Sequence, residues 1–194
     1  MKERPILFNN QMMRALLDGS KAQTRRIVKP QPDYFACGWP CVFGKCCFER
    51  NCLSSHKDNK HLIVLKSPFG KTGDQLWVRE TWARHPDYSN NAVYRADPEC
   101  KYDVDKWTPS IHMPRWASRI QLEITGVRVE RLQDISEADA LSEGVNVHPD
   151  HHGKPRDSIY SPVNAYRDLW ESINGPGSWD VDPWVWVIEF RRVK

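Results

Sequence analysis

The sequence predicts an α+β domain built on a small curved β-sheet or barrel with short flanking helices. Several short segments have the alternation and the β-branched or aromatic content of strands, and turn residues separate them. These segments do not alternate regularly with helices, as the strands of a βαβ protein would. The chain has 194 residues, which is enough for one domain with a real core. We therefore expect a single domain over residues 1–194.

The first predicted elements are a helix over residues 9–18 and a strand over residues 23–28. Gly19 ends the helix, because glycine adopts the left-handed conformation at low cost. Lys21 and Thr24 therefore lie near the turn between a helix and a strand, where functional groups often lie on a rigid scaffold. The apolar face of the helix consists of Met12, Met13, Leu16 and Leu17.

The central part of the chain begins with a predicted long insertion over residues 30–66. A dense turn signal at residues 67–74 precedes a half-buried strand over residues 75–80. A second short strand is expected at residues 92–96. Residues 109–119 contain several prolines and read as a surface segment with one helical turn.

The strongest strand signal covers residues 120–132, which alternate with a period of two. Gly126 interrupts this strand and is expected at a bulge or bend where the strand turns a corner. A helix over residues 136–143 follows, with Ser136 at its start and Gly144 at its end. The remaining elements are a loop over residues 146–162, a helix over 163–173 and a β-prone strand over 183–190.

The distribution of charged and apolar residues along the sequence limits the kinds of binding partner that we expect. Residues 1–29 carry seven lysine and arginine side chains against two acidic ones, which fits either a phosphate-bearing ligand or a solvated basic face. No segment approaches the length of a membrane span, so we expect a cytoplasmic protein with no membrane partner. The oligomeric state is not defined by these features.

The six cysteines give no specific metal signature. Five of them cluster between Cys37 and Cys52 but lack the C-x2-C spacing typical of zinc sites, and reduced thiols are the favoured reading. Downstream histidines, His56 and His61, could still complete a zinc site there. A metal site at His148, His151 and His152 is not expected. Because Walker and dinucleotide-binding glycine patterns are also absent, we expect no cofactor and no metal.

Glu143 is unusual because it is a carboxylate in the last turn of its predicted helix. The negative end of the helix dipole disfavours a negative charge there by about 0.3–1 kcal/mol. One interpretation is that Glu143 has a function, and the other is that it is simply exposed.

The motif Gly19-x-Lys21-x-x-Thr24-x-Arg26 is followed by a Gly73-Asp74 turn, the strand over 120–132 and the helix that carries Glu143. With these features the chain resembles the ASCH domain family, which belongs to the PUA-like superfamily of small β-barrels. Residues 76–82, 112–119 and 170–175 are similar to ASCH-like proteins of bacteriophages and prophages. The resemblance covers most of the chain outside insertions at about residues 30–66 and 146–162.

The resemblance implies a catalytic set. The superfamily includes RNA-binding modules and an amidohydrolase that removes the acetyl group from N4-acetylcytidine with a lysine, a threonine and a glutamate. The motif places the lysine and the threonine on Lys21 and Thr24, and the helix places the glutamate on Glu143, with Glu137 as the next candidate. This predicts an amidohydrolase-like protein that acts on an N-acylated nucleoside or nucleotide.

The chemistry of this set imposes two conditions. A lysine can take the proton of the Thr24 hydroxyl only if the pKa of Lys21 is lowered, and the nearby Arg25 and Arg26 together with burial would lower it. In a strictly extended strand Lys21 and Thr24 point to opposite faces, so the mechanism requires a turn at residues 20–23.

The alternative function is a non-catalytic module that binds single-stranded RNA or a nucleotide. Basic side chains would contact phosphates, and tryptophans such as Trp77, Trp82 and Trp116 would stack on bases. The predicted substrate-binding residues are Arg25, Arg26, Arg79 and Trp77.

Overall fold

The computed structural model shows an α+β fold, as the sequence predicts. It describes residues 1–31, 66–88, 90–97, 102, 104–145 and 161–193, together with the backbone alone of residues 33–34, 40–42 and 45–46. The side chains of the cysteine cluster, residues 146–160 and the three histidines among them lie outside the described residues. Whether the cysteines bind zinc therefore stays open, and the two insertions stay predictions.

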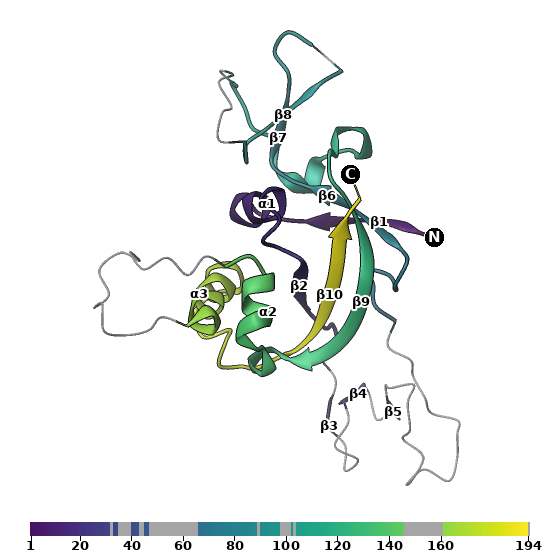
Figure 1. The fold of residues 1–194 in the computed structure, drawn as a ribbon, viewed down its shortest axis with the longest axis vertical. Helices are drawn as coiled ribbons and strands as arrows, with labels where there is room; N and C mark the ends of the chain where they lie inside the picture. The colour runs from purple at the N-terminus through teal and green to yellow at the C-terminus, as the bar shows by residue number, and fades with distance from the viewer. Residues whose placement is uncertain are drawn as a thin grey trace, which may run out of the picture.

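Within the described residues there are three α-helices and ten strands, and Figure 1 shows their arrangement. The helices are α1 (Asn10–Leu17), α2 (Glu137–Ser142) and α3 (Pro162–Asn174), and the 3-10 helices are η2 (Ser110–His112), η3 (Arg115–Ala117) and η4 (Leu132–Asp134). The strands are β1 (Glu3–Leu7), β2 (Gln23–Ile27), β3 (Asp33–Tyr34), β4 (Pro40–Val42), β5 (Lys45–Cys46), β6 (Gln75–Arg79), β7 (Trp82–Arg84), β8 (Ala92–Tyr94), β9 (Gln121–Arg131) and β10 (Trp184–Arg192).

The main sheet has five strands in the order β1-β6-β9-β10-β2. Strands β1 and β6 are parallel, and the other neighbours are antiparallel. The pairing of β9 with β10 shifts between Glu189 and Phe190, opposite Gly126 and Ile124. This irregularity confirms the bulge expected at Gly126. Within the described residues the sheet is open, with β1 and β2 at its edges.

The core lies between the main sheet and the helices. Strands β9 and β10 curve, and α2 and α3 lie on the side toward which they curve (Figure 1). The predicted apolar face of α1 is buried through Met12, Met13 and Leu16, because the period of 3.6 residues brings these side chains to one face. Strand β10 is buried over most of its length, as expected for an interior strand that lies between β9 and β2.

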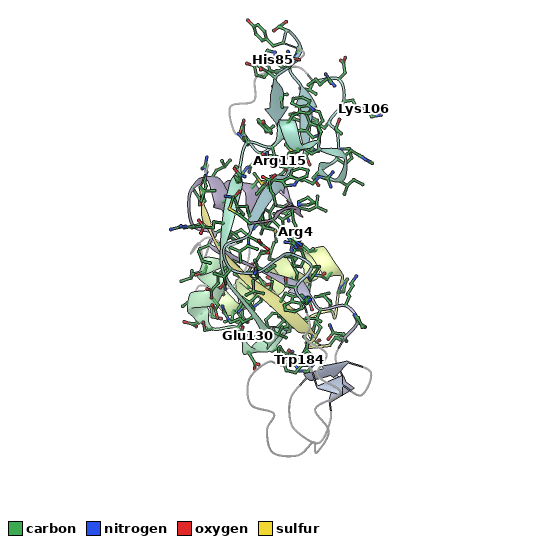
Figure 2. The ribbon with its side chains drawn as sticks, turned by 90° about the vertical axis from the view of Figure 1, so that its right-hand side faces the viewer. Arg4, His85, Lys106, Arg115, Glu130 and Trp184 are labelled. Atoms are coloured by element: carbon green, nitrogen blue, oxygen red, sulfur yellow. The ribbon has the colours of Figure 1, made fainter. Side chains whose placement is uncertain are left out.

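A separate lobe contains β7, β8, η2 and η3, and it extends away from α2 and α3 (Figures 1 and 2). Its small core consists of Trp82, Met113 and Ala117. A buried ion pair joins this lobe to the main sheet, because Arg119 donates to both oxygens of Glu80 at 2.9 and 3.0 Å. Such a bidentate pair fixes the geometry as well as neutralising the charge of a buried carboxylate.

Asp74 fixes the turn before β6 by accepting three hydrogen bonds. Its donors are the Lys2 amide at 2.8 Å, the Arg4 guanidinium at 3.1 Å and the Lys71 amide at 3.3 Å. The Lys2 hydrogen bond, with support from Arg4 and Lys71, lowers the pKa of Asp74 to about 2. This geometry explains the strong turn signal that the sequence carries at residues 67–74.

We expect acid to remove the stabilisation that Asp74 provides. An unfolded aspartate has a pKa of about 3.9, so the folded state binds fewer protons than the unfolded state between about pH 4 and pH 2. Stability should therefore fall as the pH decreases through this range, and the fall should be smaller in Asp74→Asn. Urea unfolding at pH 7 and pH 3 measures the difference, with Asp105→Asn at an exposed position as the control. Equal losses in the wild type and Asp74→Asn would contradict this assignment.

The helices in the described ranges include none with the length and apolar composition required to cross a membrane.

Candidate functional site

The chain turns sharply after α1 and brings Lys21 beside the end of α2. The Lys21 amide donates to the Ala15 carbonyl at 2.9 Å, and the Ala22 amide donates to the Ser142 carbonyl at 2.8 Å. Lys21 and Glu143 form an isolated antiparallel bridge, although they lie 122 positions apart in the sequence. The turn itself lies at Asp18 and Gly19, whereas Lys21 already forms a bridge and β2 begins at Gln23. The turn over residues 20–23 that the catalytic hypothesis requires is therefore not formed.

Lys21 and Glu143 form a buried ion pair. The Lys21 Nζ lies 2.9 Å from Glu143 Oε2, and it also donates to the Glu143 backbone carbonyl at 2.8 Å. The two side chains are 0% and 1% exposed. The interpretation of Glu143 as a simply exposed residue is therefore wrong, because the bridge places the end of α2 against residues 21–22.

Burial lowers the pKa of Lys21, because a charged ammonium loses its hydration inside the protein. Glu143 opposes this effect by stabilising the positive charge, whereas Arg26 and Arg25 lower the pKa further. The balance favours a lowered pKa, so burial outweighs the ion pair. The sequence predicts the opposing influences but not which of them is larger.

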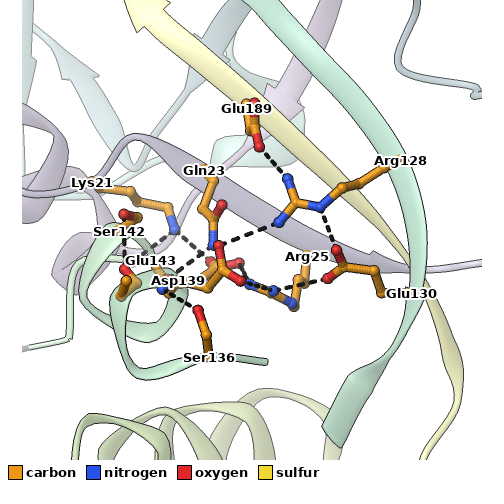
Figure 3. A network of polar contacts seen from close by, with 11 residues as sticks. Lys21, Gln23, Arg25, Arg128, Glu130, Ser136, Asp139, Ser142, Glu143 and Glu189 are labelled. Atoms are coloured by element: carbon orange, nitrogen blue, oxygen red, sulfur yellow. Dashed lines mark hydrogen bonds and ion pairs between the residues drawn. The ribbon is translucent and has the colours of Figure 1, made fainter. Parts of the chain in front are cut away.

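Arg25 contacts the carboxylate oxygen of Glu143 that Lys21 does not contact (Figure 3). Its Nη1 lies 3.3 Å from Glu143 Oε1, and its Nη2 lies 3.2 Å from Glu130 Oε2 and 3.3 Å from Asp139 Oδ2. Gln23 adds a hydrogen bond to the Asp139 carbonyl at 2.9 Å. Because side chains alternate along β2, Gln23 and Arg25 share the face that meets α2. Each oxygen of Glu143 therefore has a basic partner.

Arg128 completes the network at its outer edge (Figure 3). It donates to Glu130 and Glu189 and lies 3.2 Å from Asp139 Oδ1. The arrangement alternates charge from the buried Lys21 outward to Arg128. We expect it to hold Glu143 and Arg25 in fixed orientations, since hydrogen-bonded carboxylates and guanidinium groups constrain each other.

Thr24 lies on the opposite face of β2 from Gln23 and Arg25, where it pairs with Ile188 of β10. Its side chain is buried, and its Oγ1 has no hydrogen-bond partner among the described residues. Thr24 and Lys21 therefore do not hydrogen-bond to each other in this structure. A buried hydroxyl without a partner is uncommon and calls for a specific explanation.

A small cavity of about 50 Å³ lies beside Glu143, and Arg26 and Tyr166 contribute to its wall. Arg26 donates to the Leu7 carbonyl at 2.6 Å, and its guanidinium lies 5.5 Å from the centre of the Phe8 ring. Pockets for drug-sized ligands usually measure about 300–1,000 Å³, so this cavity is too small for a nucleoside. Substrate binding here requires the site to open.

Trp77 and Arg79 lie elsewhere, on β6. The Arg79 guanidinium lies 5.0 Å from the centre of the Trp77 ring, and that of Arg115 lies 5.9 Å from it. No hydrogen bond, ion pair or ring contact joins Trp77 or Arg79 to Lys21 or Glu143 in the described part of the chain. The structure thus brings together Lys21, Glu143, Arg25 and Arg26 but does not add the β6 pair to them.

Asp139, Glu130 and Arg128 also belong to this site, although they are not among the residues predicted from the sequence. Two signals could have found them. Asp139 lies four residues before Glu143, which is the spacing of neighbours on one helix face. Arg128 and Glu130 are two residues apart on the strongest predicted strand, so they share a face of the sheet.

Among the described residues, no group of three or more histidine, cysteine, aspartate and glutamate side chains could hold a metal ion. Comparison of the chain with protein-family models, curated proteins and solved structures found no match. The class of protein is therefore defined by the structure alone. It is an α+β fold with an open five-stranded sheet, and a buried lysine–glutamate–arginine network lies beside the edge strand β2.

Proposed function

We propose that this chain is an amidohydrolase-like protein of the ASCH type, with a PUA-like fold, that acts on an N-acylated nucleoside or nucleotide. The observation that carries the proposal is the buried contact of Lys21 with Glu143, which holds both groups in a fixed orientation, while burial lowers the pKa of Lys21. The G-x-K-x-x-T-x-R motif and the five-stranded curved sheet support the ASCH assignment.

In the proposed reaction the neutral Lys21 amine takes the proton of the Thr24 hydroxyl. The Thr24 oxygen attacks the acyl carbon, and the bond from that carbon to the exocyclic nitrogen breaks. The Lys21 ammonium returns its proton to this nitrogen, and the deacylated nucleoside or nucleotide leaves. Water then hydrolyses the threonine ester by the same proton transfers and releases the carboxylic acid.

Glu143 acts as a positioning residue in this mechanism. One of its oxygens holds the Lys21 Nζ while Arg25 holds the other, so the amine can move only within a narrow range. Thr24 must rotate or approach to reach the amine, because the two do not hydrogen-bond in the substrate-free structure. Catalytic hydrogen bonds are often open before the substrate binds and close in the complex. The unpartnered Thr24 hydroxyl supports this role, since a nucleophile must be free to react.

Loss of the Lys21 amine or of the Thr24 hydroxyl should strongly reduce turnover. We expect Lys21→Met and Thr24→Val to lower kcat/KM on N4-acetylcytidine by about 10²–10⁴-fold, the usual contribution of proton transfer by a positioned group. Wild-type kcat/KM should increase with pH toward the lowered pKa of Lys21, because only the neutral amine acts as a base. Release of cytidine measures the rate, and Lys71→Ala at an exposed lysine is the matched control.

Turnover that survives Thr24→Val would remove Thr24 from the mechanism, and turnover that survives Lys21→Met would remove Lys21. If the folded wild type hydrolyses neither N4-acetylcytidine nor other N-acyl nucleosides, the proposal is wrong.

A second candidate function is a non-catalytic module for RNA or nucleotides. The contact of Trp77 with the Arg79 and Arg115 guanidinium groups favours it, since an aromatic face beside positive charge suits a base and its phosphate. Lys21 and Arg25 would contribute little, because their charges are already neutralised inside the protein. Salt-sensitive RNA binding without any hydrolysis, reduced by Trp77→Ala, would favour this function over the amidohydrolase.

A further inference from the structure

The lobe formed by β7, β8, η2 and η3 contains a cavity of about 900 Å³ that is separate from the Lys21 network. Figure 1 shows β7 and β8 at one end of the molecule, away from α2 and α3, and Figure 2 shows His85 near the tip of this lobe. The volume falls in the range of ordinary ligand pockets. Its lining includes His85, Tyr88, Asn90, Asn91, Tyr102 and Trp116.

The aromatic side chains around this cavity are much more exposed than their size predicts. Tyr88, Tyr102 and Trp116 are 63%, 46% and 50% exposed. Large apolar groups gathered around one hollow commonly mark a binding site, whereas single exposed ones do not. Among the described residues, three exposed aromatic side chains therefore line one cavity.

The rings around the cavity contact one another in tilted or edge-to-face pairs. The His85 ring lies 5.0 Å from that of Tyr88 and 4.4 Å from that of Tyr102, and the planes are tilted by 54° and 64°. Trp116 contacts Trp82 edge to face, at 5.4 Å and 89°. None of these pairs is stacked in parallel. These contacts hold the rings in place, and the exposed parts of Tyr88 and Tyr102 offer aromatic surface on which a planar ligand can stack.

The backbone of the hairpin holds this aromatic surface in position. The His85 amide donates to the Asn91 carbonyl, and the Asn91 amide donates to the Tyr88 carbonyl, each at 2.9 Å. His85 Nδ1 accepts from the Asp87 amide at 3.1 Å, so the neutral ring carries its proton on Nε2. A preorganised loop lowers the entropic cost of binding.

Polar and positive groups next to the rings indicate the chemistry of the ligand. The amides of Asn90 and Asn91 in the lining offer donors and acceptors that match the edge of a nucleobase. The Arg84 guanidinium lies 5.6 Å from the centre of the Trp116 ring, which places a positive charge beside the stacking surface. Aromatic faces, amide edges and a neighbouring guanidinium together suit a base that carries a phosphate.

We propose that this aromatic cavity binds a nucleobase, either in a nucleotide or in a single strand of RNA. The inference does not rest on the proposed hydrolysis, because no residue of the cavity belongs to the Lys21 network. It goes beyond that function by assigning a second, non-catalytic binding site.

Titration of the purified chain with adenosine 5′-monophosphate and with a short oligouridylate tests the proposal, with ribose 5-phosphate as the base-free control. Stacking contributes about 1–3 kcal/mol per base, so Tyr88→Ala/Tyr102→Ala should weaken binding by about fivefold to more than a hundredfold. Tyr88→Phe/Tyr102→Phe keeps both rings and should bind as the wild type does. Both tyrosines are largely exposed, so these variants should fold, and thermal melting checks this.

Similar affinity for the nucleotide and the oligouridylate would assign a mononucleotide site, and much tighter binding of the oligouridylate would assign a strand-binding site. The proposal is overturned if neither probe saturates the wild type at millimolar concentration. It is also overturned if the double alanine variant binds as tightly as the wild type, or if ribose 5-phosphate binds equally well. These binding results do not depend on whether the Lys21 site hydrolyses an N-acyl nucleoside, so the two proposals can fail separately.

Discussion

Glu143→Ala should destabilise the protein by about 3–5 kcal/mol at neutral pH. The substitution leaves the Lys21 Nζ and one arm of Arg25 buried without their carboxylate partner, and removing one member of a buried ion pair typically costs this much. Chemical denaturation of the wild type and the variant measures the difference in the free energy of unfolding. Glu137→Ala is the matched control, because Glu137 is an exposed glutamate in the same helix and should change stability by about 0.5 kcal/mol.

The cost of Glu143→Ala should decrease as the pH increases. Without the carboxylate, the pKa of Lys21 falls further below its unfolded value of about 10.4, so the unfolded state binds more protons than the folded state. Stability then rises with pH between the folded and unfolded pKa values, and it rises more in the variant than in the wild type. A cost that is equal at pH 7 and pH 10 would show that Lys21 does not carry the buried charge.

A double variant separates the ion pair from other effects of Glu143. Lys21→Met/Glu143→Ala removes both charges, so it should be more stable than the sum of the two single substitutions implies. Additive losses would mean that the contact between the two side chains contributes nothing.

Gly144→Ala should be the second strongly destabilising substitution, with a cost of about 2–4 kcal/mol. Gly144 has a φ of +82°, and a Cβ built on it would lie 2.6 Å from the Ala15 Cβ and 3.0 Å from the Lys21 Cβ. The new methyl group would therefore push α1 and the turn at Lys21 away from the end of α2. Because this contact also positions the Lys21–Glu143 pair, we expect Gly144→Ala to lower any activity as well as stability.

Gly19→Ala provides the matched control for Gly144→Ala. Gly19 has nearly the same φ, +83°, but nothing lies within 4 Å of its added Cβ. Its substitution should cost only the backbone strain of about 1–2 kcal/mol. Denaturation of both variants thus isolates the cost of the steric contact. Equal costs for the two substitutions would show that the packing of α2 against α1 and Lys21 is not tight.

Most of the secondary structure follows from local sequence patterns. The helix at Asn10–Leu17 and the strands at Gln75–Arg79 and Gln121–Arg131 lie within two residues of their predicted bounds. Strand β1, at Glu3–Leu7, was not predicted. It is short, contains a proline, and buries only Ile6, so it shows no clear alternation. Its strand conformation depends on parallel pairing with β6, which is distant in the sequence.

The candidate site was predicted in part. The motif singles out Lys21 and the end of a helix singles out Glu143, and the structure places the two in a buried ion pair. Their catalytic roles stay predictions. The predicted use of Arg25 and Arg26 for substrate binding stays a prediction, and the structure adds that Arg25 contacts three carboxylates. Those carboxylates belong to β9 and α2, and their approach to β2 depends on how the sheet curves. Local periodicity does not encode that curvature.

The sequence by itself determined the α+β class, the turn after α1 and the residue types available for chemistry near Lys21. Only the tertiary structure decided that Lys21 and Glu143 meet, that burial lowers the pKa of Lys21, and that Thr24 faces away from Gln23 and Arg25. The physical reason is that local propensities act over a few residues. Ion pairing and desolvation instead depend on groups that the fold brings together from distant parts of the chain.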